Sequence, residues 1–138
     1  MSMKKLFLDT NVIIDVLTRR EPFFLASANI LEQGATGHCA LFASAISFIN
    51  GLYVSRKSLG TDQALQHIKT LRQIVSVAPI GEYEFDRALV MEGKDLEDNL
   101  QYQAALSAGC DCIITRNKKD FPSDGVLPVY TPTEFFEL

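Results

Sequence analysis

The ten residues from Leu6 to Asp15 read LFLDTNVIID and place a carboxylate directly after a short apolar run. Residues 4–8 have the length and apolar character of a buried strand, and residues 11–17 have the spacing of an apolar helix face. Either Asp9 or Thr10 is a suitable N-cap for that helix. The chain is therefore predicted to turn from strand to helix at Asp9, which places an acid at the end of a buried strand.

The composition is that of an ordinary soluble globular protein. Of the 138 residues, 47% are hydrophobic and 22% are charged, and no low-complexity tract or internal repeat interrupts the chain. A chain of this length can bury one core without disulfides or metal ions. We therefore expect a single domain over residues 1–138.

The rest of the sequence alternates between strand and helix patterns. Further strands are expected at residues 39–43, 75–80 and 110–115, with a short apolar piece at 126–130. Helices are expected from Pro22 to about Gly34, from Ser44 to 56, from Thr61 to 71, over 82–92, from Asp95 to 108, and in a final turn capped by Thr133. This alternation predicts an α/β fold, a Rossmann-like three-layer sandwich with a central parallel sheet.

Polar residues follow two of the predicted strands. Asp9 ends the first, and residues 115–117 (Thr, Arg and Asn) end the fourth. Ligands of parallel α/β sheets bind at the carboxyl ends of the strands, and short right-handed connections start the helix at Asp95 on the same rim. That helix brings Glu97 and Asp98 with it. Convergent oxygen ligands of this kind suit hard cations such as Mg²⁺.

Simpler interpretations exist for each acid taken alone. Asp95 and Asp98 have the spacing of an N-cap and a favourable acid in the first turn of a helix. Asp9 is also an ordinary cap, and Thr115 can satisfy backbone groups of a loop.

Four segments taken together resemble PIN domains in their order and spacing: FLDTNVIID, SAISFINGLY, KDLEDNLQYQAAL and IITRNKKDF. PIN domains are small α/β nucleases whose acids hold Mg²⁺ or Mn²⁺ and cleave the RNA backbone, and many stand-alone bacterial members are toxins of toxin–antitoxin pairs. The resemblance therefore implies a metal-dependent ribonuclease. It also implies three partners: RNA, an antitoxin protein and a second copy of the chain.

The resemblance assigns roles to individual residues. Asp9 and Asp98 match the acids that hold the metal ion, and Asn11 matches the helical residue that orients the groups around it. Thr115 matches the threonine that ends the fourth strand. The hydrolysis needs an activated water, and a bound divalent cation lowers the pKa of its water toward neutrality.

Two positions depart from the family pattern. Asn50 stands where a glutamate is usual, and Asn117 stands where an aspartate is common. An amide supplies an oxygen without charge, so the site attracts a second metal ion less strongly. Asp95, Glu97 or Asp120 can compensate, and Asp95 and Asp120 are candidates for a catalytic base or a supporting role. Asn50 is expected to face the site.

The formal net charge of -4 does not favour nucleic-acid binding by the whole surface, so RNA must meet a local basic patch. Arg116, Lys118 and Lys119 stand beside the predicted rim and are expected to position the RNA phosphates. The other basic pairs, residues 19–20 and 56–57, are interpreted as solvated surface.

Other features carry less functional information. Cys39, Cys110 and Cys112 are interpreted as reduced core thiols. The apolar run before Asp9 is too short for a signal peptide and no segment has the length of a membrane span, so a cytoplasmic protein is expected.

Two alternatives to the ribonuclease remain open. A phosphoaspartate hydrolase would use Asp9 as a nucleophile, but such enzymes need an acid where this chain has Asn11. A PIN-like domain without catalysis, which only binds RNA or a protein, is kept open by Asn50 and Asn117.

Overall fold

The computed structural model describes residues 3–93, 95–123 and 125–138. Five strands and seven α-helices are present in these residues, with one 3-10 turn, η1, over Lys118–Asp120. The strands are β1 (Lys4–Leu8), β2 (Cys39–Ser44), β3 (Val75–Ala78), β4 (Cys112–Ile114) and β5 (Val129–Tyr130). The helices are α1 (Thr10–Leu17), α2 (Phe24–Ala35), α3 (Ala45–Leu59), α4 (Thr61–Arg72), α5 (Glu82–Leu89), α6 (Leu96–Ser107) and α7 (Pro132–Phe135).

The strands form one parallel sheet in the order β3-β2-β1-β4-β5. β1 is the centre, with Leu6 opposite Leu41 of β2 on one side and opposite Cys112 of β4 on the other. The chain leaves β1 toward β2 and later returns to the other side of β1 as β4. Such a reversal of direction opens a crevice at the carboxyl ends of the neighbouring strands, which here are the ends of β1 and β4.

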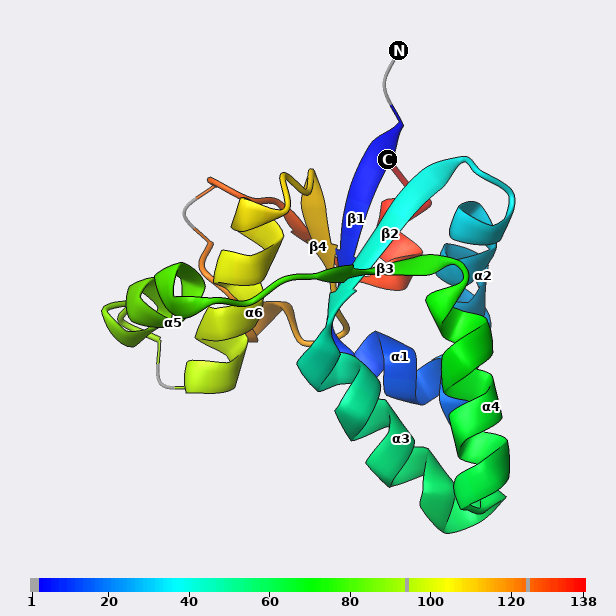
Figure 1. Ribbon diagram of the computed structural model, residues 1–138. Helices are drawn as coiled ribbons and strands as arrows, with labels where there is room; N and C mark the ends of the chain where they lie inside the picture. The colour runs from blue at the N-terminus through cyan, green and yellow to red at the C-terminus, as the bar shows by residue number, and fades with distance from the viewer. Residues whose placement is uncertain (1–2, 94, 124) are drawn as a thin grey trace.

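Two apolar clusters lie on opposite faces of the sheet, because side chains of β1 alternate between them. Leu6 and Leu8 pack with residues from α1 to α4, whereas Phe7 packs with Tyr102 and Ala105 of α6. Figure 1 shows α5 and α6 together on one side of the sheet, away from α2 and α4. The predicted three-layer sandwich with a parallel sheet is confirmed.

Several predicted helix ends differ from the structure. The helix that begins after Ser44 runs to Leu59 and not to 56, and α5 ends at Leu89 and not at 92. The last helix is capped by Thr131 and not by Thr133, because the Thr131 hydroxyl accepts from the Glu134 N–H while the Glu134 carboxylate accepts from the Thr131 N–H. The second helix begins at Phe24 and not at Pro22. A turn in which the Phe23 N–H donates to the Arg20 carbonyl at 2.9 Å holds the proline outside the helix.

The three cysteines are free and buried, as predicted. Burial raises the pKa of both Cys110 and Cys112 to about 12, so these thiols are unreactive near neutral pH. Over the described residues, the structure has no helix with the length and apolarity that crossing a membrane requires.

Candidate active site

The candidate site begins where β1 and β4 end side by side. The Asp9 N–H donates to the carbonyl of Ile114 at 3.0 Å, which fixes the two strand ends against each other. Asp9 is the N-cap of α1, and its carboxylate accepts from the Thr10 N–H at 2.8 Å. The simpler interpretation of Asp9 as a cap is therefore correct, but capping uses only one of the two carboxylate oxygens.

The second oxygen of Asp9 is held by the loop after β4. The Thr115 hydroxyl donates to Asp9 Oδ2 at 2.8 Å, and Asn11 Nδ2 approaches the same oxygen at 3.2 Å. Asn11 Nδ2 also donates to Thr115 Oγ1, and its Oδ1 accepts from the Arg116 N–H. Asn11 thus holds Asp9, Thr115 and the Arg116 backbone together. That it orients the groups around a metal ion stays a prediction. Burial raises the pKa of Asp9, although the bond from Thr115 opposes this shift.

The first turn of α6 supplies the second group of acids. Asp95 is the N-cap of α6, and its carboxylate accepts from the Asp98 N–H at 3.1 Å. Burial raises the pKa of Asp98 to about 7, and repulsion from Asp95, Asp9, Asp120 and Glu97 adds to this rise. Asp98 therefore lies among carboxylates that come from three separate parts of the chain.

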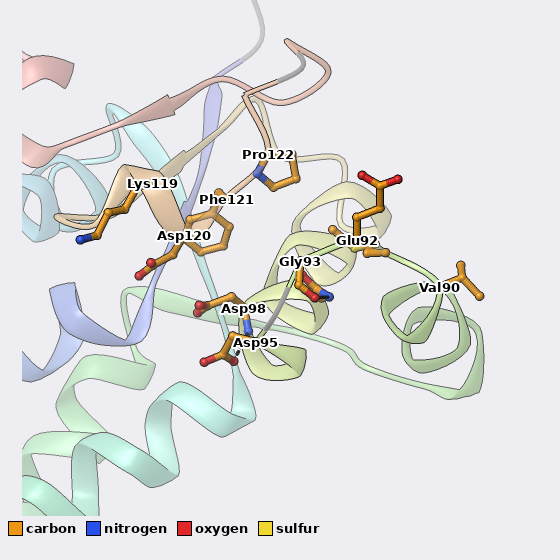
Figure 2. A pocket seen from close by; sticks show the side chains of 11 residues that line it. Val90, Glu92, Gly93, Asp95, Asp98, Lys119, Asp120, Phe121 and Pro122 are labelled. Atoms are coloured by element: carbon orange, nitrogen blue, oxygen red, sulfur yellow. Dashed lines mark hydrogen bonds between the residues drawn. The ribbon is translucent and has the colours of Figure 1, made fainter.

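These side chains line one cleft of about 310 Å³. Its lining consists of Asp9, Thr10, Asn11, Ile14, Arg20, Asp95, Glu97, Asp98, Arg116, Asn117 and Asp120. We call this space the acidic cleft. A second pocket of about 690 Å³ adjoins it and shares Asp95, Asp98 and Asp120. Figure 2 shows these three carboxylates on one side of the second pocket, with Phe121 and Pro122 beside them.

Asn117 and Asn50, the two asparagines that replace usual acids of the family, lie in different places relative to the cleft. Asn117 lines the acidic cleft. Asn50 is outside its lining, but Asn50 Nδ2 donates to Glu97 Oε1 at 3.0 Å, and Glu97 does line it. Asp95, Glu97 and Asp120, left open as compensating acids by the sequence, all reach the cleft.

The three predicted RNA-positioning cations have other neighbours. The Arg116 guanidinium donates to both oxygens of Asp15, at 2.7 and 3.1 Å, and it lies over the ring of Phe23 at 4.4 Å. Lys118 pairs with Glu134 of α7 at 2.9 Å and is outside the lining of the acidic cleft. That Lys118 positions RNA phosphates beside the rim stays a prediction. Lys119 lines the second pocket.

Two groups of residues in or beneath the site are missed by sequence reasoning. Gln101 Nε2 donates to the hydroxyls of Thr10 and Ser47, which bond each other at 2.7 Å, so α6 is tied to α1 and α3 directly beside Asp9. The spacing of Gln101 three residues after Asp98 on one helix face is the signal for it. For buried Asp15, the signal is a lone charge in an apolar helix face.

The donor set of the cleft suits a hard divalent cation. Across the described residues the ion pairs are Arg116–Asp15 and Lys118–Glu134, so Asp9 and Asp98 are in neither pair. In the same part of the chain, no three side chains of His, Cys, Asp or Glu are arranged to hold one metal ion. Mg²⁺ commonly binds through one or two carboxylates and several waters. Asp9 and Asp98 both line the cleft and are the carboxylates available for that mode.

Known proteins resemble the chain over nearly its whole length. Residues 5–119 match the family model described as PIN domain. Ribonuclease VapC1 of Aquifex aeolicus (strain VF5) is 32% identical to the chain over 142 residues, which cover 99% of this chain and 96% of that protein.

Solved structures agree with the fold. A chain of a toxin-antitoxin complex from Klebsiella pneumoniae has a TM-score of 0.69 at 23% identity and covers 92% of this chain and 97% of its own length. A chain of VapBC-1 from nontypeable Haemophilus influenzae has a TM-score of 0.68 at 22% identity, with 94% and 98% covered. At these identities the likeness concerns the fold.

Proposed function

The chain belongs to the PIN domain family, and from that premise we propose that it is a ribonuclease dependent on Mg²⁺ or Mn²⁺ that hydrolyses phosphodiester bonds of RNA in the acidic cleft. One observation carries the proposal. Asp9 and Asp98 are far apart in the sequence, line the same cleft and have no cationic side chain paired with them among the described residues.

The named relative supports the choice of substrate. Its name is Ribonuclease VapC1, and the alignment with it covers 99% of this chain. The raised pKa values of Asp9 and Asp98 support the choice of cofactor, since carboxylates that repel one another are stabilised by a nearby cation.

We assign different roles to different residues of the cleft. Asp9 and Asp98 would hold the cation, and Asn11 with Thr115 keeps Asp9 in one orientation. A divalent cation, when bound, supplies a water of lowered pKa and offsets charge that develops on the phosphoryl oxygens. Asp120 lies beside Asp98 and is a candidate to accept a proton during the reaction.

Cleavage of a mixed RNA panel by the purified protein tests this proposal. The reaction is run with Mn²⁺, with Mg²⁺ and with EDTA, alongside Asp9→Asn and Asp98→Asn. We expect metal-dependent cleavage that falls by at least about a hundredfold in both variants, since each removes a charged ligand. Asp62→Asn, an exposed acid on α4, is the matched control and keeps full activity. Folded, inhibitor-free protein that cleaves nothing contradicts the proposal.

We also propose that the chain is the toxin of a toxin–antitoxin pair, inhibited by an antitoxin protein. The names of the similar solved structures, a toxin-antitoxin complex and VapBC-1, support this. Induction in a growing bacterium should stop growth and degrade RNA, and Asp98→Asn should abolish both effects. Unchanged growth and intact RNA while folded protein accumulates in the cytoplasm would contradict a toxin role.

A domain that only binds RNA or a protein is the second candidate, favoured by the neutral Asn50 and Asn117. The loss of two acids at these positions counts for less in the structure, because three other acids, Asp95, Glu97 and Asp120, line the same cleft. A phosphoaspartate hydrolase is disfavoured, because Asn11 uses both its amide nitrogen and its oxygen to hold Asp9, Thr115 and Arg116.

A further inference from the structure

A cleft that holds several carboxylates needs a cationic side chain of its own to hold an RNA phosphate. Of the three cations that the sequence offers, two are paired with acids outside the metal-holding pair, and the third lines the adjoining pocket. Arg116 uses its guanidinium on Asp15, Lys118 uses its ammonium on Glu134, and Lys119 lines the second pocket. The hydrogen bond with Asp15 also raises the pKa of Arg116.

Arg20 lines the acidic cleft together with Asp9, Asn11 and Asp98. Its side chain is exposed, and within the described residues it forms no ion pair. It therefore meets both requirements for a phosphate contact, since the guanidinium is available and lies beside the acids that would hold the metal ion. Guanidinium groups suit phosphate because they present two parallel N–H donors.

The backbone after α1 fixes the position of Arg20. The Arg20 N–H donates to the carbonyl of Asp15 at 3.0 Å, and the Arg20 carbonyl accepts from the Phe23 N–H at 2.9 Å. Asp15 and Phe23 are the two residues that hold the Arg116 guanidinium. The loop that carries Arg20 is thus tied to the same residues that bind Arg116.

The preceding residue faces another way. Arg19 has a φ of 50°, in the left-handed region, and its guanidinium lies over the ring of Phe24 at 5.5 Å. Arg19 lines an apolar groove with Phe24, Leu31 and Leu71, and it is absent from the lining of the acidic cleft. The turn at Arg19 therefore sends two consecutive arginines to two different cavities.

We propose that Arg20 is the phosphate-binding residue of the acidic cleft and contacts the RNA backbone beside the metal-holding acids. Arg116 is then a positioning residue, which ties the loop after β4 to α1 through Asp15. This assignment rests on the proposed function for its substrate, a single-stranded RNA segment. It revises the interpretation of residues 19–20 as solvated surface.

Binding of a labelled single-stranded RNA oligonucleotide, measured by fluorescence anisotropy at several salt concentrations, tests the assignment. Every protein carries Asp98→Asn, so that the RNA stays intact, and the buffer contains EDTA. Arg20→Ala should weaken binding by about tenfold, as expected for the loss of one contact to a charged group. The slope of log affinity against log salt should also fall by about 0.7, the value for one phosphate contact on a single strand.

Two further variants make the result specific. Arg20→Lys should keep the salt slope, because the charge remains, but recover only part of the affinity, because the two-pronged contact is lost. Arg19→Ala is the matched control and should change neither quantity, since Arg19 faces the apolar groove. Thermal unfolding of each variant checks that the fold is retained.

The assignment is overturned if Arg20→Ala binds RNA within twofold of its parent with the same slope, if Arg19→Ala has the larger effect, or if the parent binds no RNA. Failure of the Arg20 assignment can be distinguished from failure of the ribonuclease proposal. A wild-type protein that binds RNA through Arg20 but cleaves nothing would overturn the nuclease and leave the phosphate contact in place.

Discussion

At the scale of single residues, the site depends on polar groups that hold one another in place. Asp9 is buried and would point in several directions without its partners, but Thr115 and Asn11 bind one of its oxygens and the Thr10 N–H binds the other. Fixing a carboxylate before its ligand arrives lowers the entropic cost of binding that ligand.

The Asp15–Arg116 pair gives the first prediction. The Asp15 side chain is only 1% exposed and that of Arg116 is 22% exposed. Removing the acid therefore leaves a mostly buried guanidinium without its partner. We expect Asp15→Ala to lower the free energy of unfolding by about 2 to 4 kcal/mol in urea titrations, near the cost of breaking a buried pair. Arg72→Ala, an exposed residue on α4, is the control. A loss below 0.5 kcal/mol for Asp15→Ala, roughly a surface effect, would show that the pair does not hold the loop.

The second prediction concerns the pH dependence of stability in metal-free protein. Asp98 has a pKa of about 7 when folded and 3.8 as its ordinary value, so the folded state keeps a proton that the unfolded state has released. The contribution of Asp98 to stability is therefore lost as pH rises from about 4 to about 7. Asp98→Asn should be more stable than the wild type at pH 7.5 but not at pH 4, by denaturant unfolding in EDTA. An equal difference at both pH values would refute the raised pKa.

At the scale of elements, the start of α6 combines a helix cap with candidate residues of the site. Asp95 caps this helix by accepting from the Asp98 N–H, so the cap and the candidate metal ligand share one turn. The sequence predicts both interpretations of Asp95 and cannot choose between them. The structure shows that the two are compatible, because Asp95 caps the helix and also lines the acidic cleft. Its part in catalysis stays a prediction.

A pair of substitutions at Asp95 separates the two roles. Asp95→Ala removes the cap and should cost about 1 kcal/mol of stability, whereas Asp95→Ser keeps a capping oxygen and should cost little. If Asp95 also contributes to catalysis, Asp95→Ser will still lose activity toward RNA. Thermal unfolding and RNA cleavage of the two variants measure both effects. Equal destabilisation by Ala and Ser would contradict the capping role.

Packing between α1 and α3 sets the position of the first acid, because Asp9 caps α1. Gly51 of α3 faces α1, and a Cβ at this position would lie 2.9 Å from Leu17 Cδ1 and 3.2 Å from Ile13 Cγ2. We expect Gly51→Ala to destabilise the protein by about 1 to 2 kcal/mol, since overpacking outweighs the gain in helix propensity. Ser58→Ala, exposed on the same helix, should stay near zero. A more stable Gly51→Ala would show that α1 and α3 can separate freely.

At the scale of the whole molecule, the sequence predicts the fold and much of the site. Strands and helices alternate clearly, and parallel sheets place their ligands at one edge, so the sequence alone leads us to expect that Asp9 and Thr115 meet there. Their contact at 2.8 Å confirms this expectation. The same topology predicts that the acids at the start of α6 lie at this edge of the sheet.

What sequence reasoning misses depends on contacts between distant segments. The partner of Lys118 is Glu134, which reaches it from α7, and the partner of Arg116 is Asp15, from the opposite end of the chain. Arg20 reaches the cleft because of a turn in which the non-glycine Arg19 has a positive φ. Such a conformation is uncommon outside glycine and leaves no signal in the sequence.

The central claim is that Asp9 and Asp98 together hold the divalent ion of a ribonuclease. Binding of Mn²⁺ to the purified protein, followed by electron paramagnetic resonance of the free ion, tests it most directly. We predict a Mn²⁺ site that is lost in Asp9→Asn and in Asp98→Asn and is retained in Asp62→Asn. Mn²⁺ binding that survives both substitutions, or protein that binds no Mn²⁺, would contradict the claim.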